Sequence, residues 1–388
     1  MDMELNADQI SARQAFRQFV EQHVIPTAAK CDALRETPPE LIESLAREGY
    51  LGALVPKEYG GEGMDGLKWG LLCEAMGYGS ASLLSLLTVH SMVIQAVLKW
   101  GTQAQREKWL PPLASGKIIA GFALTENKTG SDAKNTKTSA RQQDDGTWLL
   151  QGNKKWMSFG QVASLFLILA QIDGKATAFL VERGSRGFST EPITGMMGFR
   201  SAMLAQLHMD DCLVPAENIL GRPGFGFSHV IGTALDQGRY SIAWGCAGLA
   251  RACVDACLDY TDQREQFGVP IREHQLIQEM IADMITQSRA AQMLCFRAAS
   301  LKEQGDPSLI METSMAKYFA SRAAVKIASD AVQIHGANGC SNQFPVERHF
   351  RDAKIMEIIE GSNQMQQIII ARYGYQRHQI KKKGGGNP

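Results

Sequence analysis

The sequence predicts an α+β protein of several domains: a helical N-terminal domain over residues 1–116, a small middle β-sheet or barrel domain over 117–227, and a C-terminal four-helix bundle over 228–380. Two observations predict this class. The chain has 388 residues, more than one hydrophobic core usually organises. Its hydrophobic period is helical at both ends and strand-like in the middle. Residues 381–388, three lysines and a glycine-rich end, are expected to form a disordered tail.

Helical spacing marks most of the first domain. Apolar residues recur at this spacing over 10–24, after a polar capping segment, and again over 41–51 and 70–78. The stretch 83–98 is rich in Leu and Val but is broken by polar side chains, which favours a buried core helix over a membrane span. A last helix is expected over 103–113, interrupted near its end by two prolines.

Turn signals become frequent after about residue 117, and the apolar runs between them are short. Strands are expected over 147–150, 165–171 and 176–181, in a small antiparallel sheet or barrel. The helical period returns after Gly226 in long amphipathic stretches, as a helix bundle requires: 229–260, 271–304, 308–335 and 346–359.

Composition and missing motifs exclude several function classes. Lys+Arg and Asp+Glu are both 40, and this balance argues against nucleic-acid binding. No secretory signal or membrane span is evident, and the eight scattered cysteines are typical of a reduced, cytoplasmic protein. A Gly-x-Gly-x-x-Gly turn after a strand, a P-loop, a His-Glu-x-x-His pair and the Glu-x-x-His pairs of a di-iron bundle are all missing, so no metal site is expected.

Three groups of motifs carry a family resemblance. Phe122–Ala133 (FALTENKTGSDA) resembles the first signature of the acyl-CoA dehydrogenases, and Arg264–Gly268 with His274-Gln275 resembles a second family pattern. Gln333–Gly339, Pro345–Arg348 and Arg351–Gln364 resemble its C-terminal signature. The motifs follow the family's order and spacing across essentially the whole chain. The resemblance implies the acyl-CoA dehydrogenase fold and FAD-dependent oxidation of an acyl thioester.

By this resemblance Glu360 is the base that removes the α-proton, and its backbone N–H helps to hold the thioester carbonyl. An apolar run precedes Glu360, and Gly361 suits a helix stop before a new start at Ser362 or Asn363. Both a dry pocket and a helix C-terminus would raise the pKa of the carboxyl and strengthen it as a base. The alternative is a surface glutamate before a capping glycine. Some relatives place the base at a position that is Gly238 here, which cannot serve.

The resemblance also implies a set of FAD contacts. These are Leu124, Thr125, Gly130, Ser131, Trp156 and Ser158 from the middle domain, and Arg264, Gln266, Phe267, Gln333, Gly336, Ser362 and Gln364 from the bundle. Trp156 could instead be an ordinary core aromatic, and Arg264 a surface cation. Because the family's FAD also contacts a neighbouring subunit, a homodimer or homotetramer is expected.

Substrate contacts are assigned by the same comparison to Lys128, Arg239, Trp244 and Gly361. The segment around Arg239 and the unusual Asn127-Lys128-Thr129 resemble the branch that oxidises small acyl groups on an acyl carrier protein, in the making of polyketide extender units. The alternative is an ordinary short- or branched-chain acyl-CoA dehydrogenase of catabolism. An electron-transfer flavoprotein is the expected acceptor, with direct use of O₂ as the alternative. A different class is a non-catalytic, flavin-bearing relative associated with nucleic acid.

Overall fold

The computed structural model of the protein describes residues 5–383. The chain forms two compact units. One unit combines the residues up to Glu21, Gly66–Ala81 and the chain from Arg239 onward, and is called the bundle unit. The other combines Gln22–Asp65 with Ser82–Gly238, and is called the sheet unit. The expected order of a helical, a β and a second helical part is therefore confirmed along the chain.

The sheet unit holds an eight-stranded sheet in the order β6-β7-β3-β2-β4-β5-β8, with β1 beside β4. Most neighbours pair antiparallel, as expected, but β1 and β2 both run parallel to β4. The strands are β1 (Ala120–Ala123), β2 (Ser139–Gln142), β3 (Trp148–Met157), β4 (Leu165–Ile172), β5 (Lys175–Glu182), β6 (Phe188–Pro192), β7 (Ala205–Val214) and β8 (Ile219–Leu220).

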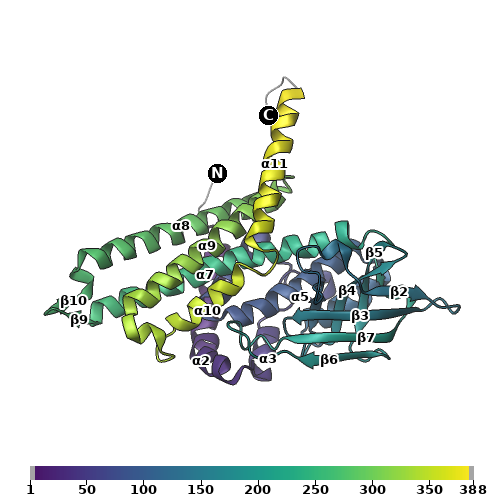
Figure 1. Ribbon diagram of the computed structural model, residues 1–388, viewed down its shortest axis with the longest axis horizontal. Helices are drawn as coiled ribbons and strands as arrows, with labels where there is room; N and C mark the ends of the chain where they lie inside the picture. The colour runs from purple at the N-terminus through teal and green to yellow at the C-terminus, as the bar shows by residue number, and fades with distance from the viewer. Residues whose placement is uncertain (1–4, 384–388) are drawn as a thin grey trace. The chain divides into compact units, whose positions relative to one another are not determined.

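Helices α5 (Ala81–Trp100) and α6 (Gln103–Ala114) of the same unit pack against the sheet, α5 beside β4 (Figure 1). The unit also contains α2 (Ile25–Leu34) and α3 (Pro39–Arg47). Leu165, Leu167 and Leu169 of β4 share a core with α5 and α6, because alternate strand residues point to one face. Helix α6 continues through Pro111 and Pro112 to Ala114, so the expected interruption was wrong.

Two helices, α5 and the segment Gly226–Gln263, are long and apolar enough to cross a membrane by length and composition. Of the apolar window in α5, 89% is buried inside the protein, and of the window in Gly226–Gln263, 78%. This burial is what core helices show, as expected for the stretch 83–98.

The bundle unit is built around α9 (Leu309–His335), which packs against α8 (Gln275–Gln304), α10 (Val346–Met356) and α11 (Asn363–Lys383) (Figure 1). Its other elements are α1 (Ala7–Phe19), α4 (Gly66–Gly79), most of α7 (Gly232–Gln263), and the hairpin β9 (Glu265–Gln266) and β10 (Val269–Pro270). Asn6 caps α1 through a reciprocal bond with Gln9, which confirms the expected capping segment.

Close packing of α4 on α7 fixes the part of α7 that carries the site. A Cβ at Gly77 would lie 2.2 Å from the carbonyl oxygen of Gly245, and one at Gly248 would lie 1.9 Å from that of Glu74. Real Cβ atoms do not approach so closely, so both positions require glycine.

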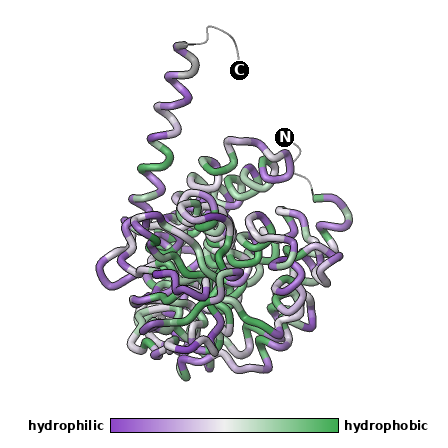
Figure 2. Tube along the Cα trace, turned by 90° about the vertical axis from the view of Figure 1, so that its right-hand side faces the viewer, coloured by the Kyte–Doolittle hydropathy of each residue, from purple (hydrophilic) through white to green (hydrophobic). Residues whose placement is uncertain are grey.

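Helix α11 differs from the expected tail. It continues to Lys383, so residues 381–383 are helical rather than disordered, and 384–388 lie outside the described residues. Figure 2 shows that α11 is mostly hydrophilic along its length.

Candidate active site

Glu360 lies in a tight turn that joins α10 to α11. Helix α10 ends at Met356 and α11 begins at Asn363. Glu360 and Gly361 both have left-handed backbones, with φ of 54° and 84°. For a glutamate this conformation is uncommon and costs on the order of 1 kcal/mol or more, so the surroundings must hold it. The helix therefore ends four residues before Glu360, and the expected contribution of a helix C-terminus to its pKa was wrong.

The Glu360 carboxylate is placed in a dry environment. The residue as a whole is partly buried, but its Oε2 atom is buried and has no hydrogen-bond partner within residues 5–383. Burial raises the pKa of Glu360 to about 7, although the positive charges of Arg239 and Lys317 lower it. A surface glutamate would have neither the buried oxygen nor the raised pKa. A buried carboxylate with a pKa near neutrality has the properties that a general base needs at neutral pH.

Two predicted substrate contacts, Arg239 and Gly361, lie beside Glu360. A Cβ at Gly361 would sit 4.0 Å from Nε of Arg239. Trp244, one turn along α7, is fully buried and packs edge-on against Phe296 with ring centroids 5.2 Å apart. A Cβ at Gly70 of α4 would lie 2.4 Å from the Trp244 ring. Trp244 thus fills the space between α4, α7 and α8, and its role at an acyl cavity stays a prediction.

The sheet unit gathers the other predicted contacts around the end of β1. Leu124 and Thr125 follow this strand, and Thr125 accepts a bond of 2.8 Å from the N–H of Lys155, next to Trp156. Trp156 is 46% exposed with a φ of 70°, at an irregularity in β3, so it is not a core aromatic. A Cβ at Gly130 would meet nothing within 4 Å. Lys128, Gly130 and Ser131 are exposed, and Ser158 is partly buried.

Glu126 organises the loop that carries these residues, and sequence reasoning missed it. Its carboxylate accepts from Thr138 Oγ1 at 2.6 Å, from the Lys137 N–H at 2.7 Å and from Lys154 Nζ at 2.9 Å, and also from Thr136. Burial alone would raise the pKa of Glu126, but these bonds and the Lys154 charge lower it well below its usual range. Burial lowers the pKa of Lys154 to about 8. A glutamate in the first signature was the only available signal.

A hollow of about 370 Å³ in the bundle unit brings together Arg264, Gln266 and Phe267 of the β9–β10 hairpin with Gly336 after α9. Phe267 is 95% exposed and has a φ of 57°. The hollow's floor includes His335, which stacks on Tyr260 at 4.1 Å and bonds the carbonyl of Ala331. Burial lowers the pKa of His335, as suits a structural histidine.

Three other predicted cofactor contacts lie outside this hollow. Gln333 is exposed on the last turn of α9, and Ser362 and Gln364 stand at the start of α11, beside the Glu360 turn. The structure thus collects the bundle residues at two places. The FAD roles of all these residues stay predictions.

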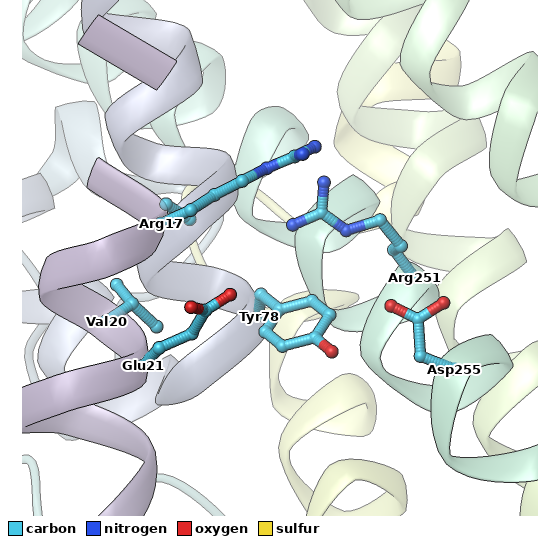
Figure 3. A pocket seen from close by; sticks show the side chains of 7 residues that line it. Arg17, Val20, Glu21, Tyr78, Arg251 and Asp255 are labelled. Atoms are coloured by element: carbon cyan, nitrogen blue, oxygen red, sulfur yellow. The ribbon is translucent and has the colours of Figure 1, made fainter. Parts of the chain in front are cut away.

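A smaller hollow of about 170 Å³ lies among α1, α4 and α7, and the side chains of Arg17 and Arg251 extend toward each other there (Figure 3). Glu21 and Asp255 line the same hollow, and Arg251 pairs with Glu74 at 3.2 Å. The charges are thus of both signs, and no sequence-predicted site residue is present, so we do not assign this hollow to the active site.

Three family models match the chain in succession: the N-terminal domain of acyl-CoA dehydrogenase over residues 6–117, its middle domain over 121–212, and its C-terminal domain over 224–374. The short-chain specific acyl-CoA dehydrogenase of Sus scrofa mitochondria is 36% identical over 365 residues, which are 92% of this chain and 88% of the relative.

Solved structures give the same result. Butyryl-CoA dehydrogenase from Megasphaera elsdenii superposes with a TM-score of 0.93 at 35% identity, covering 96% of this chain and 99% of that chain. The prolyl acyl carrier protein oxidase AnaB superposes with a TM-score of 0.91 at 30% identity, covering 95% of this chain and 99% of that chain. An acyl-CoA dehydrogenase of Bacillus anthracis in complex with FAD superposes with a TM-score of 0.90 at 30% identity, covering 98% of this chain and 68% of that chain.

Proposed function

The chain belongs to the acyl-CoA dehydrogenase family, and from this premise we propose that it oxidises the α,β-bond of a short acyl-CoA thioester, with Glu360 as the base. The observation that carries the proposal is the buried, unpartnered Oε2 of Glu360 in a strained turn. An α-proton next to a thioester is weakly acidic, so its removal needs a positioned base of raised pKa.

Glu360 accepts the α-proton at its carboxylate while the β-hydrogen leaves as hydride, and the product is the α,β-unsaturated thioester. With a pKa of about 7, the carboxyl is a much stronger base than an ordinary glutamate but is still substantially ionised at neutral pH. Arg239 and Lys317 keep it so, because their charges offset part of the burial. We propose that the backbone N–H of Glu360 donates to the thioester carbonyl, where negative charge develops.

FAD is the cofactor of the family, and features of both units suit it. Trp156 presents a half-exposed ring that can pack on a flat ligand, and the open space at Gly130 lets a ligand approach the backbone. In the bundle unit, Arg264 in the hollow can pair with a phosphate. Bound FAD supplies the acceptor for the hydride.

The comparisons favour another substrate than the one that the sequence resemblance suggested. The resemblance favoured a carrier-bound acyl group, but the relative from Sus scrofa is a short-chain acyl-CoA dehydrogenase, and the structure from Megasphaera elsdenii is a butyryl-CoA dehydrogenase. These favour a CoA thioester of fatty acid catabolism. The carrier-protein substrate remains as a second candidate, because AnaB is a carrier-protein oxidase of the same fold.

We propose that the protein works as a homo-oligomer and passes its electrons to an electron-transfer flavoprotein. Phe267 at 95% exposure is an apolar side chain that suits cover by a second copy and that copy's cofactor. A direct reaction with O₂ would instead release peroxide at the rate of turnover.

The test is anaerobic bleaching of the bound flavin by butyryl-CoA and by the butyryl group on an acyl carrier protein. Rapid bleaching by the CoA thioester supports the proposed function. Bleaching by the carrier thioester alone establishes the second candidate. No bleaching by either, from a protein with full flavin occupancy, refutes both.

A further inference from the structure

Lys317 is a buried cation that forms no ion pair with a carboxylate within residues 5–383. It lies on α9 and is 0% exposed. A buried lysine is usually paired with a carboxylate. Its ammonium instead donates to the carbonyl oxygens of Glu357 at 3.2 Å and Gly361 at 3.1 Å, and to Oδ1 of Asn363 at 3.1 Å. An ammonium has three donors, and all three are used on the turn that carries Glu360.

We call these three bonds of Lys317 the clamp, and Asn363 extends it. Its Oδ1 also accepts from Ser321 Oγ at 2.8 Å, so the side chain is held from α9 by two donors. Its Nδ2 donates to the Glu357 carboxylate at 3.3 Å, and its backbone N–H donates to the Glu357 carbonyl at 3.0 Å. The two ends of the turn are therefore joined to each other and to one cation.

The far side of the turn has a neutral support. Gln366 on α11 donates to the carbonyl of Gly361 at 2.9 Å and to that of Glu360 at 3.3 Å. The carbonyl of Gly361 thus accepts from both Lys317 and Gln366. These bonds hold two successive left-handed residues, which the backbone alone would not keep.

We propose that Lys317 is a positioning residue for the reaction: by binding the carbonyls on both sides of Glu360, its ammonium fixes the left-handed turn and aims the Glu360 carboxylate. This inference rests on the proposed role of Glu360 as the base. In this proposal Lys317 contacts neither substrate nor cofactor and acts only through the turn.

The same ammonium sets the electrostatics of the base. Burial lowers the pKa of Lys317 to about 8, against the opposing effects of Cys246, Glu360 and Glu357, and Arg239 lowers it further. Arg239 on α7 and Glu357, which Lys354 pairs at 2.6 Å, are the other charges around it. Loss of the Lys317 proton removes one donor from the clamp and one positive charge from beside Glu360.

A bell-shaped pH profile follows. Flavin reduction rises as Glu360 ionises near pH 7 and falls as Lys317 loses its proton near pH 8. Because the two groups interact, the two apparent values belong to the pair.

The experiment compares Lys317→Met and Lys317→Arg with the wild-type holoenzyme, using anaerobic flavin reduction by whichever butyryl thioester bleaches the wild type. Lys326→Met is the matched control, since Lys326 lies on the same helix, is 58% exposed and pairs with Asp330. We expect Lys317→Met to reduce the rate roughly 10- to 100-fold with little change in KM. In the pH profile of flavin reduction by Lys317→Met, the acid limb moves to higher pH, because a positive charge beside Glu360 is lost. The basic limb disappears, because the variant has no Lys317 proton to lose. Lys317→Arg keeps the charge and recovers most of the rate.

Hydrogen exchange of the segment 357–366 gives a readout that needs no substrate. Faster exchange in Lys317→Met than in Lys326→Met is expected, because the clamp bonds of Asn363 and Gln366 weaken. If Lys317→Met does not fold, Asn363→Ala tests the clamp from its other partner and should show the same faster exchange and a smaller loss of rate.

A folded Lys317→Met enzyme with wild-type rate, pH limbs and exchange overturns the proposal. So does a loss of stability with an unmoved pH profile, which marks a purely structural lysine. An active Glu360→Gln variant would instead overturn the role of the base, and the exchange data would still decide whether Lys317 holds the turn.

Discussion

Replacing Glu360 by Gln tests the base with almost no change of shape. The amide cannot accept the α-proton, and general bases of this kind contribute typically about 10²- to 10⁴-fold. With a pKa of about 7, the wild-type carboxylate is about one-tenth ionised at about pH 6 and about half ionised at about pH 7, so the acid limb of its rate profile climbs across this range. The residual rate of Glu360→Gln should show no such climb.

The same substitution should stabilise the folded protein at alkaline pH. The pKa of about 7 in the folded protein exceeds the ordinary glutamate value of 4.5, so the native state binds more protons than the unfolded state between these values, and stability falls as pH rises. The ionised Glu360 then costs roughly 3 kcal/mol above pH 7. Glu360→Gln removes this cost, which fades toward pH 4.5. Its melting temperature should exceed the wild type's by a few degrees at about pH 8.

The assays are stopped-flow flavin reduction and thermal melts over the same pH series. Glu107→Gln is the control, because Glu107 is an exposed residue of α6 whose carboxylate bonds only Gln103 among the described residues. Glu360→Asp should keep a small pH-dependent rate, since its carboxylate is shortened but present. A Glu360→Gln enzyme within about threefold of the wild-type rate would refute the assignment of the base, and unchanged melts would refute the raised pKa.

Three further substitutions test other parts of the site. Glu126→Gln leaves the buried Lys154 without its counter-charge, so the free energy of unfolding should fall by roughly 3 kcal/mol or more, and the protein should retain FAD less well. In the wild type the pKa of Glu126 is depressed, so the stabilisation by this carboxylate is present above about pH 4.5 and is lost on acidification. Unchanged melts and flavin content would contradict it. Arg264→Ala should lose FAD after gel filtration, while Arg289→Ala on α8 should keep it; equal flavin content in both variants argues against the phosphate contact. Trp244→Ala should destabilise the bundle by roughly 3–5 kcal/mol through the cavity that it leaves, and it should move the preference toward longer acyl-CoAs only if Trp244 limits the acyl pocket.

The sequence predicted the elements with strong periodicity and missed those decided by contacts between distant residues. The long helices α8 and α9 were expected nearly at their observed bounds, and the core strands β4 and β5 within about a residue. The parallel pairing of β1 with β4 could not be predicted, because it depends on which strands meet in space. The expected interruption of α6 was wrong: the prolines lie in its last turn, so they remove only the bonds that their own N–H groups would have made, and the helix continues to Ala114.

At the site, the motif located Glu360 but its surroundings came only from the structure. The helical pattern before Glu360 suggested that α10 reaches it, whereas the chain leaves the helix at Met356. A left-handed glutamate has no sequence signature apart from the glycine that follows. Glu126 and Lys154 are 28 residues apart and meet at 2.9 Å, and Lys317 is 44 residues from the carbonyl of Gly361. No local window contains either pair.

Two buried lysines, Lys154 and Lys317, each hold a loop that carries predicted site residues. Lys154 and Lys317 are each 0% exposed, each has a pKa lowered to about 8 by burial, and each donates to main-chain carbonyls of a loop that carries predicted site residues. The two lysines differ in how each is placed relative to the neighbouring carboxylate, Glu126 or Glu360. Lys154 is paired directly with Glu126; hydrogen bonds from Thr136, Thr138 and the Lys137 N–H, together with the Lys154 charge, lower the pKa of that carboxyl and leave it an anion. Lys317 binds the backbone around Glu360 but not its carboxylate, so Glu360 keeps an unpartnered oxygen and a raised pKa. A direct ion pair would have stabilised the turn and lowered the basicity of Glu360 at the same time. Holding the base by its carbonyls separates these two effects, so the turn is rigid while the carboxylate remains free to take a proton.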